Sequence, residues 1–174
     1  FALSDAPDDT RVGDGRDRIS LERLTRSLGI EPHVNFLGHL PQRAVAGELG
    51  VAELFLLMSW GEWERLPNVV KEAMASGCLC VVTETTGMSE LIQQGRHGFL
   101  VAPRNVQEAV SRVDDIFAGR VETASVSEAA AERIGSLFDA SRSMQSYIRC
   151  WHDALVRQDT RRLRSTKAPL THTP

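Results

Sequence analysis

The sequence predicts an α/β domain in which a parallel sheet carries helices on both faces, followed by a C-terminal helical extension. Short apolar runs alternate with segments of helical periodicity, a pattern typical of successive β-α-β units. Two of the runs, residues 52–58 (AELFLLM) and 79–83 (LCVVT), are almost continuously apolar. Such runs indicate strands that are covered on both faces. Together these observations predict a Rossmann-like sheet.

The expected elements follow in a regular order, each ended by a turn residue. The first half comprises a disordered or frayed start at 1–10, a strand ending at Val12, a helix up to Gly29, a strand at 34–37, a helix at 41–49 and a strand at 52–58. The second half comprises a helix up to Gly77, a strand at 79–83, a short helix at 89–92, a strand at 99–101 and helices at 106–119, 127–137 and 142–155. We expect one domain over residues 11–157 and a disordered basic tail over 158–174.

Composition narrows the classes of function. The 174 residues suffice for one domain with a core, and 42% hydrophobic with 25% charged residues is ordinary for a globular protein. A net charge of −3 gives no basic field for nucleic acid. Three cysteines cannot all pair, which favours reduced thiols and a cytoplasmic protein. No apolar run reaches the ~20 residues that span a bilayer, and no signal peptide is visible.

The ends of the chain carry two further expectations. The chain begins at Phe1 without a methionine, so we expect it to be a piece of a longer protein. The tail from Val156 is rich in arginine, which predicts either a solvated basic segment or weak contact with an anionic membrane surface.

The strongest functional signal lies in residues 59–77 (SWGEWERLPNVVKEAMASG). Pro67 suits the first turn of a helix, whose free N–H groups and positive dipole end favour an anion such as a phosphate. Glu64 lies just before this helix, and Glu72 lies at the border of its apolar arc. Both carboxylates could accept hydrogen bonds from sugar hydroxyl groups, or they could be a solvated loop acid and a helix-surface acid. The stretch therefore allows a site for a nucleotide that carries a sugar.

Several turns follow predicted strands and are expected to meet at one edge of the sheet, because ligands of open parallel sheets bind beyond the carboxyl ends of the strands. These turns are Gly13-Asp14-Gly15, Gly38-His39, residues 59–67 and residues 83–87.

Residues 64–77 resemble the Glu-x7-Glu signature of the family-4 glycosyltransferases, which are retaining enzymes of the GT-B type. The surrounding features match, in order, the C-terminal donor-binding half of that family over about residues 11–115: the glycine turn VGDG at 12–15, VNFLG at 34–38, the strand at 52–59, TGMSELI at 86–92 and GFLV at 98–101. This resemblance implies a sugar transfer from a nucleotide-diphosphate donor, with retention at the anomeric carbon.

The resemblance also implies roles for individual residues. Glu64 would contact the transferred sugar as the catalytic residue, and Glu72 would bind the ribose. The remaining donor contacts would be backbone N–H groups of Leu66, Asn68 and Val69 at the diphosphate, Gly13 and Gly15 beside the nucleotide, and Phe36 and Leu37 near the base. No metal and no cofactor beyond the donor substrate is implied.

Three departures from the family pattern bear on activity. Arg65 stands where the family usually has glycine, so its side chain would either crowd the diphosphate or add a contact to it. The family's basic residues before the glycine turn, and its acceptor-binding N-terminal half, have no counterpart in residues 1–174. We therefore expect weak donor binding and little turnover from this chain alone.

The sequence also allows other hypotheses about the function of the domain and about single residues. The domain could be a non-catalytic nucleotide-sugar binding module, or half of another GT-B enzyme such as a phosphorylase or epimerase. The five histidines share no ligand spacing, and only His39 follows a strand on the presumed ligand edge. Trp60 and Trp63 could stack on a base or cover the core. Cys78 and Cys80 are expected to pack on one face of their strand.

Overall fold

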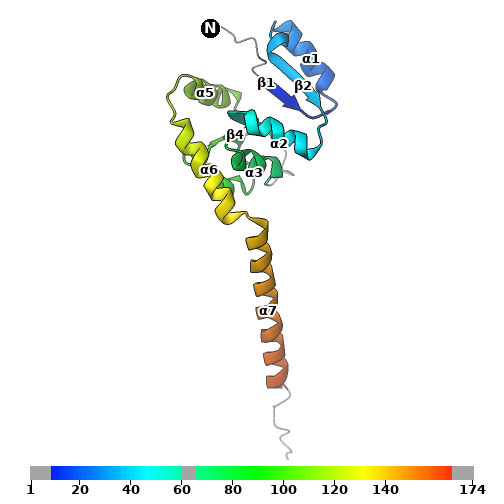
Figure 1. The fold of residues 1–174 in the computed structure, drawn as a ribbon, viewed down its shortest axis with the longest axis vertical. Helices are drawn as coiled ribbons and strands as arrows, with labels where there is room; N and C mark the ends of the chain where they lie inside the picture. The colour runs from blue at the N-terminus through cyan, green and yellow to red at the C-terminus, as the bar shows by residue number, and fades with distance from the viewer. Residues whose placement is uncertain (1–8, 60–65, 166–174) are drawn as a thin grey trace, which may run out of the picture.

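The computed structural model describes residues 9–59 and 66–165 of the chain (Figure 1). Its described strands form two parallel groups. β1 (Asp9–Val12) pairs with β2 (Val34–Gly38), and β3 (Leu54–Leu57), β4 (Leu79–Thr83) and β5 (Phe99–Val101) form a sheet with β4 in the middle. The predicted α/β class, with parallel strands flanked by helices, is confirmed.

Helices connect the strands as the sequence predicts. They are α1 (Arg18–Ser27), the 3-10 helix η1 (Glu31–His33), α2 (Gln42–Val51), α3 (Asn68–Ala75), α4 (Met88–Leu91), α5 (Val106–Phe117), α6 (Thr123–Leu137) and α7 (Ala140–Ser165). Gly29 and Gly77, which end α1 and α3, have φ values of +68° and +86°, a conformation that glycine adopts without strain. Asn105 caps α5 by accepting a hydrogen bond from the Glu108 N–H.

β4 is the centre of the core, and its side chains alternate between two layers. Cys80 and Val82 pack toward α3 and α6, within a cluster that also contains Val70, Met74 and Ala130. Both Cys78 and Cys80 are buried in this layer, as predicted. The other layer lies against α5 and is formed by Leu79, Val81, Phe99, Val101 and Val126, with Leu54, Ala109, Ile116 and Val121 around them. Helices thus cover both faces of the three-stranded sheet.

The expectation that residues 52–58 are covered on both faces is wrong. Phe55 and Leu57 pack in the α3 layer, whereas Leu56 is 45% exposed on the opposite face. The physical reason is position: β3 is an edge strand of its sheet, and α5 lies over β4 and β5. A continuous apolar run shows that a strand can be buried on both faces, but it does not show whether helices of the fold cover both of them.

Both ends of the chain also differ from expectation. β1 begins at Asp9, so residues 9 and 10 belong to a strand instead of a frayed start. α7 continues to Ser165, so residues 158–165 are helical and not disordered. No glycine or proline interrupts the chain between Ala140 and Pro169, and arginine and leucine favour the helical state. The rest of the predicted tail, 166–174, lies outside the described residues.

α7 extends away from the body of the molecule (Figure 1). Its apolar side chains Met144, Tyr147, Ile148, Trp151 and Leu155 are all more than half exposed. Among the described helices, none combines the length and apolarity needed to cross a membrane.

Candidate functional site

The first two predicted turns meet at the carboxyl ends of β1 and β2. The Gly13 N–H donates a hydrogen bond to the Gly38 carbonyl over 2.7 Å. Gly13 has a φ of +127° and Gly38 a φ of +68°, so both positions favour glycine. The glycine turn after β1 and the turn after β2 therefore lie side by side, as the sequence predicts for one sheet edge.

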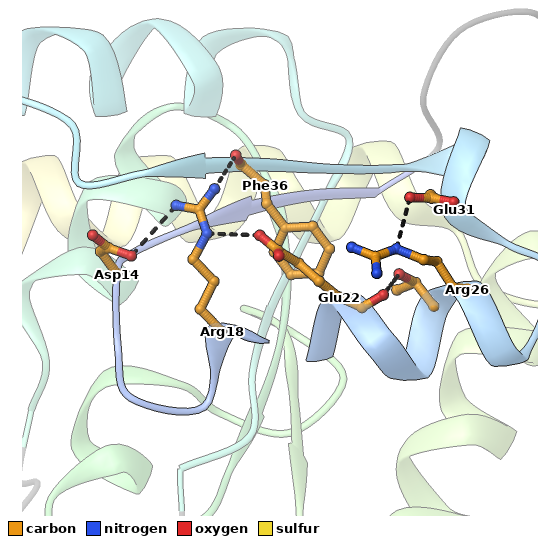
Figure 2. A network of polar contacts seen from close by, with 7 residues as sticks. Asp14, Arg18, Glu22, Arg26, Glu31 and Phe36 are labelled. Carbon is orange, nitrogen blue, oxygen red and sulfur yellow. Dashed lines mark hydrogen bonds and ion pairs between the residues drawn. The ribbon is translucent and has the colours of Figure 1, made fainter. Parts of the chain in front are cut away.

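Arg18 fixes this pair of turns through three contacts (Figure 2). Its Nε donates to Glu22 Oε1 at 2.8 Å, Nη1 lies 3.4 Å from Asp14 Oδ1, and Nη2 donates to the Phe36 carbonyl at 3.3 Å. The hydrogen bond to Glu22 raises the pKa of the Arg18 guanidinium above its usual value. A Cβ at Gly38 would lie only 2.9 Å from Arg18 Nη1, so this glycine leaves room for the network.

The entrance of α3 has no side-chain cap. Pro67 precedes the first helical residue, and it makes no side-chain cap hydrogen bond within the described part of the chain. Asn68 is exposed, Leu66 and Val69 are half-buried, and Val70 is fully buried. The backbone N–H groups predicted to hold a diphosphate therefore belong to a helix that is anchored by its apolar face.

Leu66 also contacts the loop that follows β4. A Cβ placed at Gly87, whose φ is +87°, would lie 3.1 Å from Leu66 Cδ1. In the same loop the Thr85 Oγ1 is buried and has no hydrogen-bond partner among the residues that the structure describes. Thr83, at the end of β4, places its Oγ1 3.9 Å from Met58 Sδ just beyond the end of β3. These contacts bring the entrance of α3 and the turn at 83–87 to one place.

Glu72 faces the first turn of α2. Its Oε1 accepts a hydrogen bond of 3.5 Å from Gln42 Nε2, and its side chain is half-buried. Gln42 is the first residue of α2 and closely follows Gly38. The carboxylate predicted to bind a sugar hydroxyl therefore contacts the start of the helix that follows the Gly38 turn.

α4 is held from behind by α6. Arg133 donates from Nε to the Leu91 carbonyl at 2.8 Å and from Nη2 to the Glu90 carbonyl at 2.6 Å. Nearby His97 is buried and accepts a 3.3 Å hydrogen bond at Nδ1 from the Gln93 N–H. Burial, and then the charges of Arg133 and Arg96, lower the pKa of His97. His97 is thus a neutral packing residue behind the loop.

Some predicted residues are not tested by these contacts. Glu64, Arg65, Trp60 and Trp63 lie outside the described residues. His39 is exposed.

The remaining predicted residues lie along the first turn and β2. The Gly15 carbonyl accepts a hydrogen bond from the Arg18 N–H, and Phe36 and Leu37 are half-buried in β2.

Sequence reasoning missed three residues at this edge. Arg18 stands four residues from both Asp14 and Glu22, a helical ion-pair spacing that could have identified it. Gln42 follows a proline, which predicts that a helix starts there, but the sequence does not indicate that its side chain contacts Glu72. The buried hydroxyl of Thr85 has no sequence signal.

The sequence profile of the family described as Glycosyl transferases group 1 matches residues 10–118, which includes the glycine turn, all of α3 and the turn at 83–87. The chain belongs to the group 1 glycosyl transferases. The resemblance seen in the sequence is confirmed at this level.

One characterised relative of this group 1 glycosyl transferase chain is the N-acetyl-alpha-D-glucosaminyl L-malate synthase of Bacillus anthracis. It is 31% identical over 144 residues, which are 83% of the chain and 37% of the relative. The chain thus spans little more than a third of that protein.

Solved structures agree on the fold. Anabaena HepE, in a complex with UDP-glucose, matches with a TM-score of 0.72 and 25% identity over 83% of the chain and 40% of HepE. The C-terminal domain of the group 1 glycosyl transferase LpcC from Francisella tularensis matches with a TM-score of 0.64 and 18% identity, over 73% of the chain and 66% of that domain. The GT-B, Rossmann-like architecture is therefore shared.

Proposed function

We propose that the chain is the donor-binding half of a retaining, family-4 glycosyltransferase that takes a sugar from a nucleotide-diphosphate donor. The observation that carries this proposal is the set of contacts at the sheet edge described above. Within the family match, Gly13 contacts Gly38, Leu66 at the entrance of α3 contacts Gly87, and Glu72 contacts Gln42, which follows the Gly38 turn by four residues. Binding of UDP-glucose by HepE supports a donor of the same chemical class.

In the proposed donor site, both backbone N–H groups and side chains would bind the donor. The uncapped first turn of α3, with Leu66, Asn68 and Val69, would receive the diphosphate, because free N–H groups and the helix dipole favour an anion there. Glu72 would accept hydrogen bonds from the ribose, exchanging its long contact with Gln42 for a ligand hydroxyl. Gly13 and Gly15 would border the nucleotide, with Phe36 and Leu37 near the base.

Glu64 is proposed to contact the transferred sugar, and Arg65 to lie beside the diphosphate. Both assignments come from the Glu-x7-Glu spacing that joins Glu64 to Glu72. A guanidinium next to a diphosphate would add a charge-assisted contact. The acceptor side of the reaction is proposed to lie in the part of such enzymes that residues 1–174 do not cover, so this chain alone would turn over little donor.

Calorimetric titration with UDP-, GDP- and ADP-sugars tests the proposal. We expect one nucleotide class to bind with heat that the free sugar does not produce. Absence of heat with every donor, measured on folded protein at concentrations of several hundred micromolar or more, would contradict a donor site. Glu128, an exposed acid on α6, offers a control: Glu128→Gln should leave the donor preference unchanged.

A further inference from the structure

Arg18 joins α1 to both turns of the proposed donor site (Figure 2). It is the first residue of α1, and its guanidinium contacts Asp14 in the turn after β1 and the Phe36 carbonyl near the end of β2. We propose that Arg18 is a positioning residue for the nucleotide: it holds these two segments at the spacing that the base requires, and so determines how tightly and how selectively the base binds. This role rests on the proposed function, because it needs a nucleotide at this edge.

The end of β2 is not held by strand pairing alone. Consecutive residues of β1 pair with Phe36 and Gly38, so the register skips Leu37. Such a bulge interrupts the ladder of backbone hydrogen bonds and bends the strand, and bulges often lie beside active sites, where they redirect a side chain. Among the described strands, β2 pairs with β1 and with no other. The conformation of the bulge therefore depends on contacts from outside the strand pair.

Arg18 supplies such a contact. Its Nη2 donates to the Phe36 carbonyl at 3.3 Å, directly before the skipped residue, and its Nη1 lies 3.4 Å from Asp14 Oδ1. Glu22, one helical turn further along α1, accepts a hydrogen bond from Nε at 2.8 Å. Because the guanidinium is planar and rigid, fixing Nε also fixes the directions of both Nη groups. One side chain therefore holds the glycine turn and the bulge in a single arrangement.

Gly38 provides the space that this guanidinium occupies. A Cβ at position 38 would lie 2.9 Å from Arg18 Nη1, which is too close unless one of the two groups shifts. The carbonyl of Gly38 also accepts the 2.7 Å hydrogen bond from the Gly13 N–H. The arginine and the paired glycines therefore act together, and a side chain at position 38 would displace the guanidinium.

The charges around Arg18 favour a positioning role over direct binding of the diphosphate. The carboxylates of Asp14 and Glu22 both pair with the guanidinium, so this group of three side chains carries more negative than positive charge. A phosphate close to the group would be repelled by the two carboxylates. Arg18 is therefore expected to act through the backbone that it holds.

Amide hydrogen exchange of the free protein tests whether Arg18 holds the turns. In Arg18→Met the Gly13 amide, which donates to Gly38, should exchange about tenfold faster than in the wild type, because local opening becomes easier when the hydrogen bonds are lost. Arg26→Met is the matched control: it removes another arginine of α1, whose ion pair with Glu31 is exposed. This control should leave exchange at Gly13 unchanged.

Calorimetric titration with uridine, guanosine and adenosine diphosphates tests the effect on the nucleotide. Arg18→Met should weaken binding of the preferred nucleotide about tenfold and reduce the preference for one base over the other two, since a site that is poorly held loses both affinity and selectivity. Arg26→Met should bind like the wild type. A loss of stability alone would lower the Tm without changing the selectivity among the bases, so selectivity is the readout that distinguishes the two roles.

Two further variants separate position from charge. Arg18→Lys keeps the positive charge but cannot contact three partners with a rigid fork, so it should bind the nucleotide as weakly as Arg18→Met. Gly38→Ala should also weaken binding. Adding Arg18→Met to it should cause little further loss, because the alanine already displaces the guanidinium.

Three results would each overturn the role of Arg18: wild-type exchange at Gly13 in Arg18→Met, wild-type affinity and base preference in that variant, or full affinity in Arg18→Lys. The last result would show that the charge suffices. If the wild type binds none of the three nucleotides, the proposed function fails together with this role. If the wild type and the Arg18 variants bind equally well, the role fails and the function stands.

Discussion

Gly87 lies where the loop after β4 meets the entrance of α3. Its φ of +87° and the 3.1 Å approach to Leu66 leave no unstrained place for a side chain. We expect Gly87→Ala to lower the free energy of unfolding by about 1–3 kcal/mol, the usual cost of a strained backbone position. Urea denaturation measures this change. Gly135→Ala is the matched control, because Gly135 lies within α6 with open space around it, and alanine there should stabilise the helix.

His97 gives the stability of the fold a pH dependence with a definite sign. Burial lowers the pKa of His97 in the folded state below the unfolded value of about 6.5. As the pH falls, the unfolded state therefore binds the proton first, and stability decreases from about pH 6.5 down to the folded pKa. Urea titrations at several pH values should show this loss for the wild type.

The same titrations on two variants assign the effect to His97. His97→Gln should flatten the decrease, whereas His152→Gln, at an exposed position on α7, should leave it unchanged. A decrease of equal size in the His97→Gln variant would show that another group is responsible.

At the level of elements, α4 depends on α6 for its position. The two hydrogen bonds from Arg133 to the Glu90 and Leu91 carbonyls join elements about forty residues apart in the sequence. We expect Arg133→Met to destabilise the fold by about 1–3 kcal/mol, since hydrogen bonds from a charged group are lost. Arg120→Met removes only an exposed ion pair with Asp115 and should cost less than about 1 kcal/mol. Thermal unfolding of both variants checks the difference.

The order of elements could be predicted because local signals and packing agree. β4 is apolar at four of its five positions and buried at all five, and Gly29 and Gly77 end helices where the sequence predicts. β3 was less predictable, because the exposure of Leu56 depends on which neighbours cover the sheet. The full length of α7 was underestimated because its later part has a weak apolar period, although nothing in its sequence stops the helix before Pro169.

The candidate site, like the fold, could be predicted from the sequence only in part. Glycines at 13, 38 and 87 could be identified because each stands in a turn after a predicted strand, and in the structure each has a positive φ. Partners distant in the sequence could not: the contact between Gln42 and Glu72 spans thirty residues, and only the packing of α2 beside α3 brings it about.

On the scale of the whole molecule, α7 contributes little to the stability of the body, from which it stands apart (Figure 1). Deleting residues 147–174 should change the free energy of unfolding by less than about 0.5 kcal/mol, the range of ordinary surface changes. Deleting from Thr123 onward should prevent folding, because Val126 and Ala130 of α6 are buried in the two core layers. Calorimetric unfolding of the two truncated chains measures this contrast.

The proposed binding site for a sugar nucleotide comprises Glu72, the entrance of α3 and the glycine turns. The most direct test is calorimetric titration of two variants with the preferred donor. Glu72→Ala should weaken binding by about 1–3 kcal/mol, the cost of leaving a ligand hydroxyl unpaired. Glu53 is exposed and directly precedes the first residue of β3, at the end of the strand away from the proposed site. The Glu53→Ala variant should therefore bind the donor like the wild type. Equal affinity of the two variants for the donor would contradict the account.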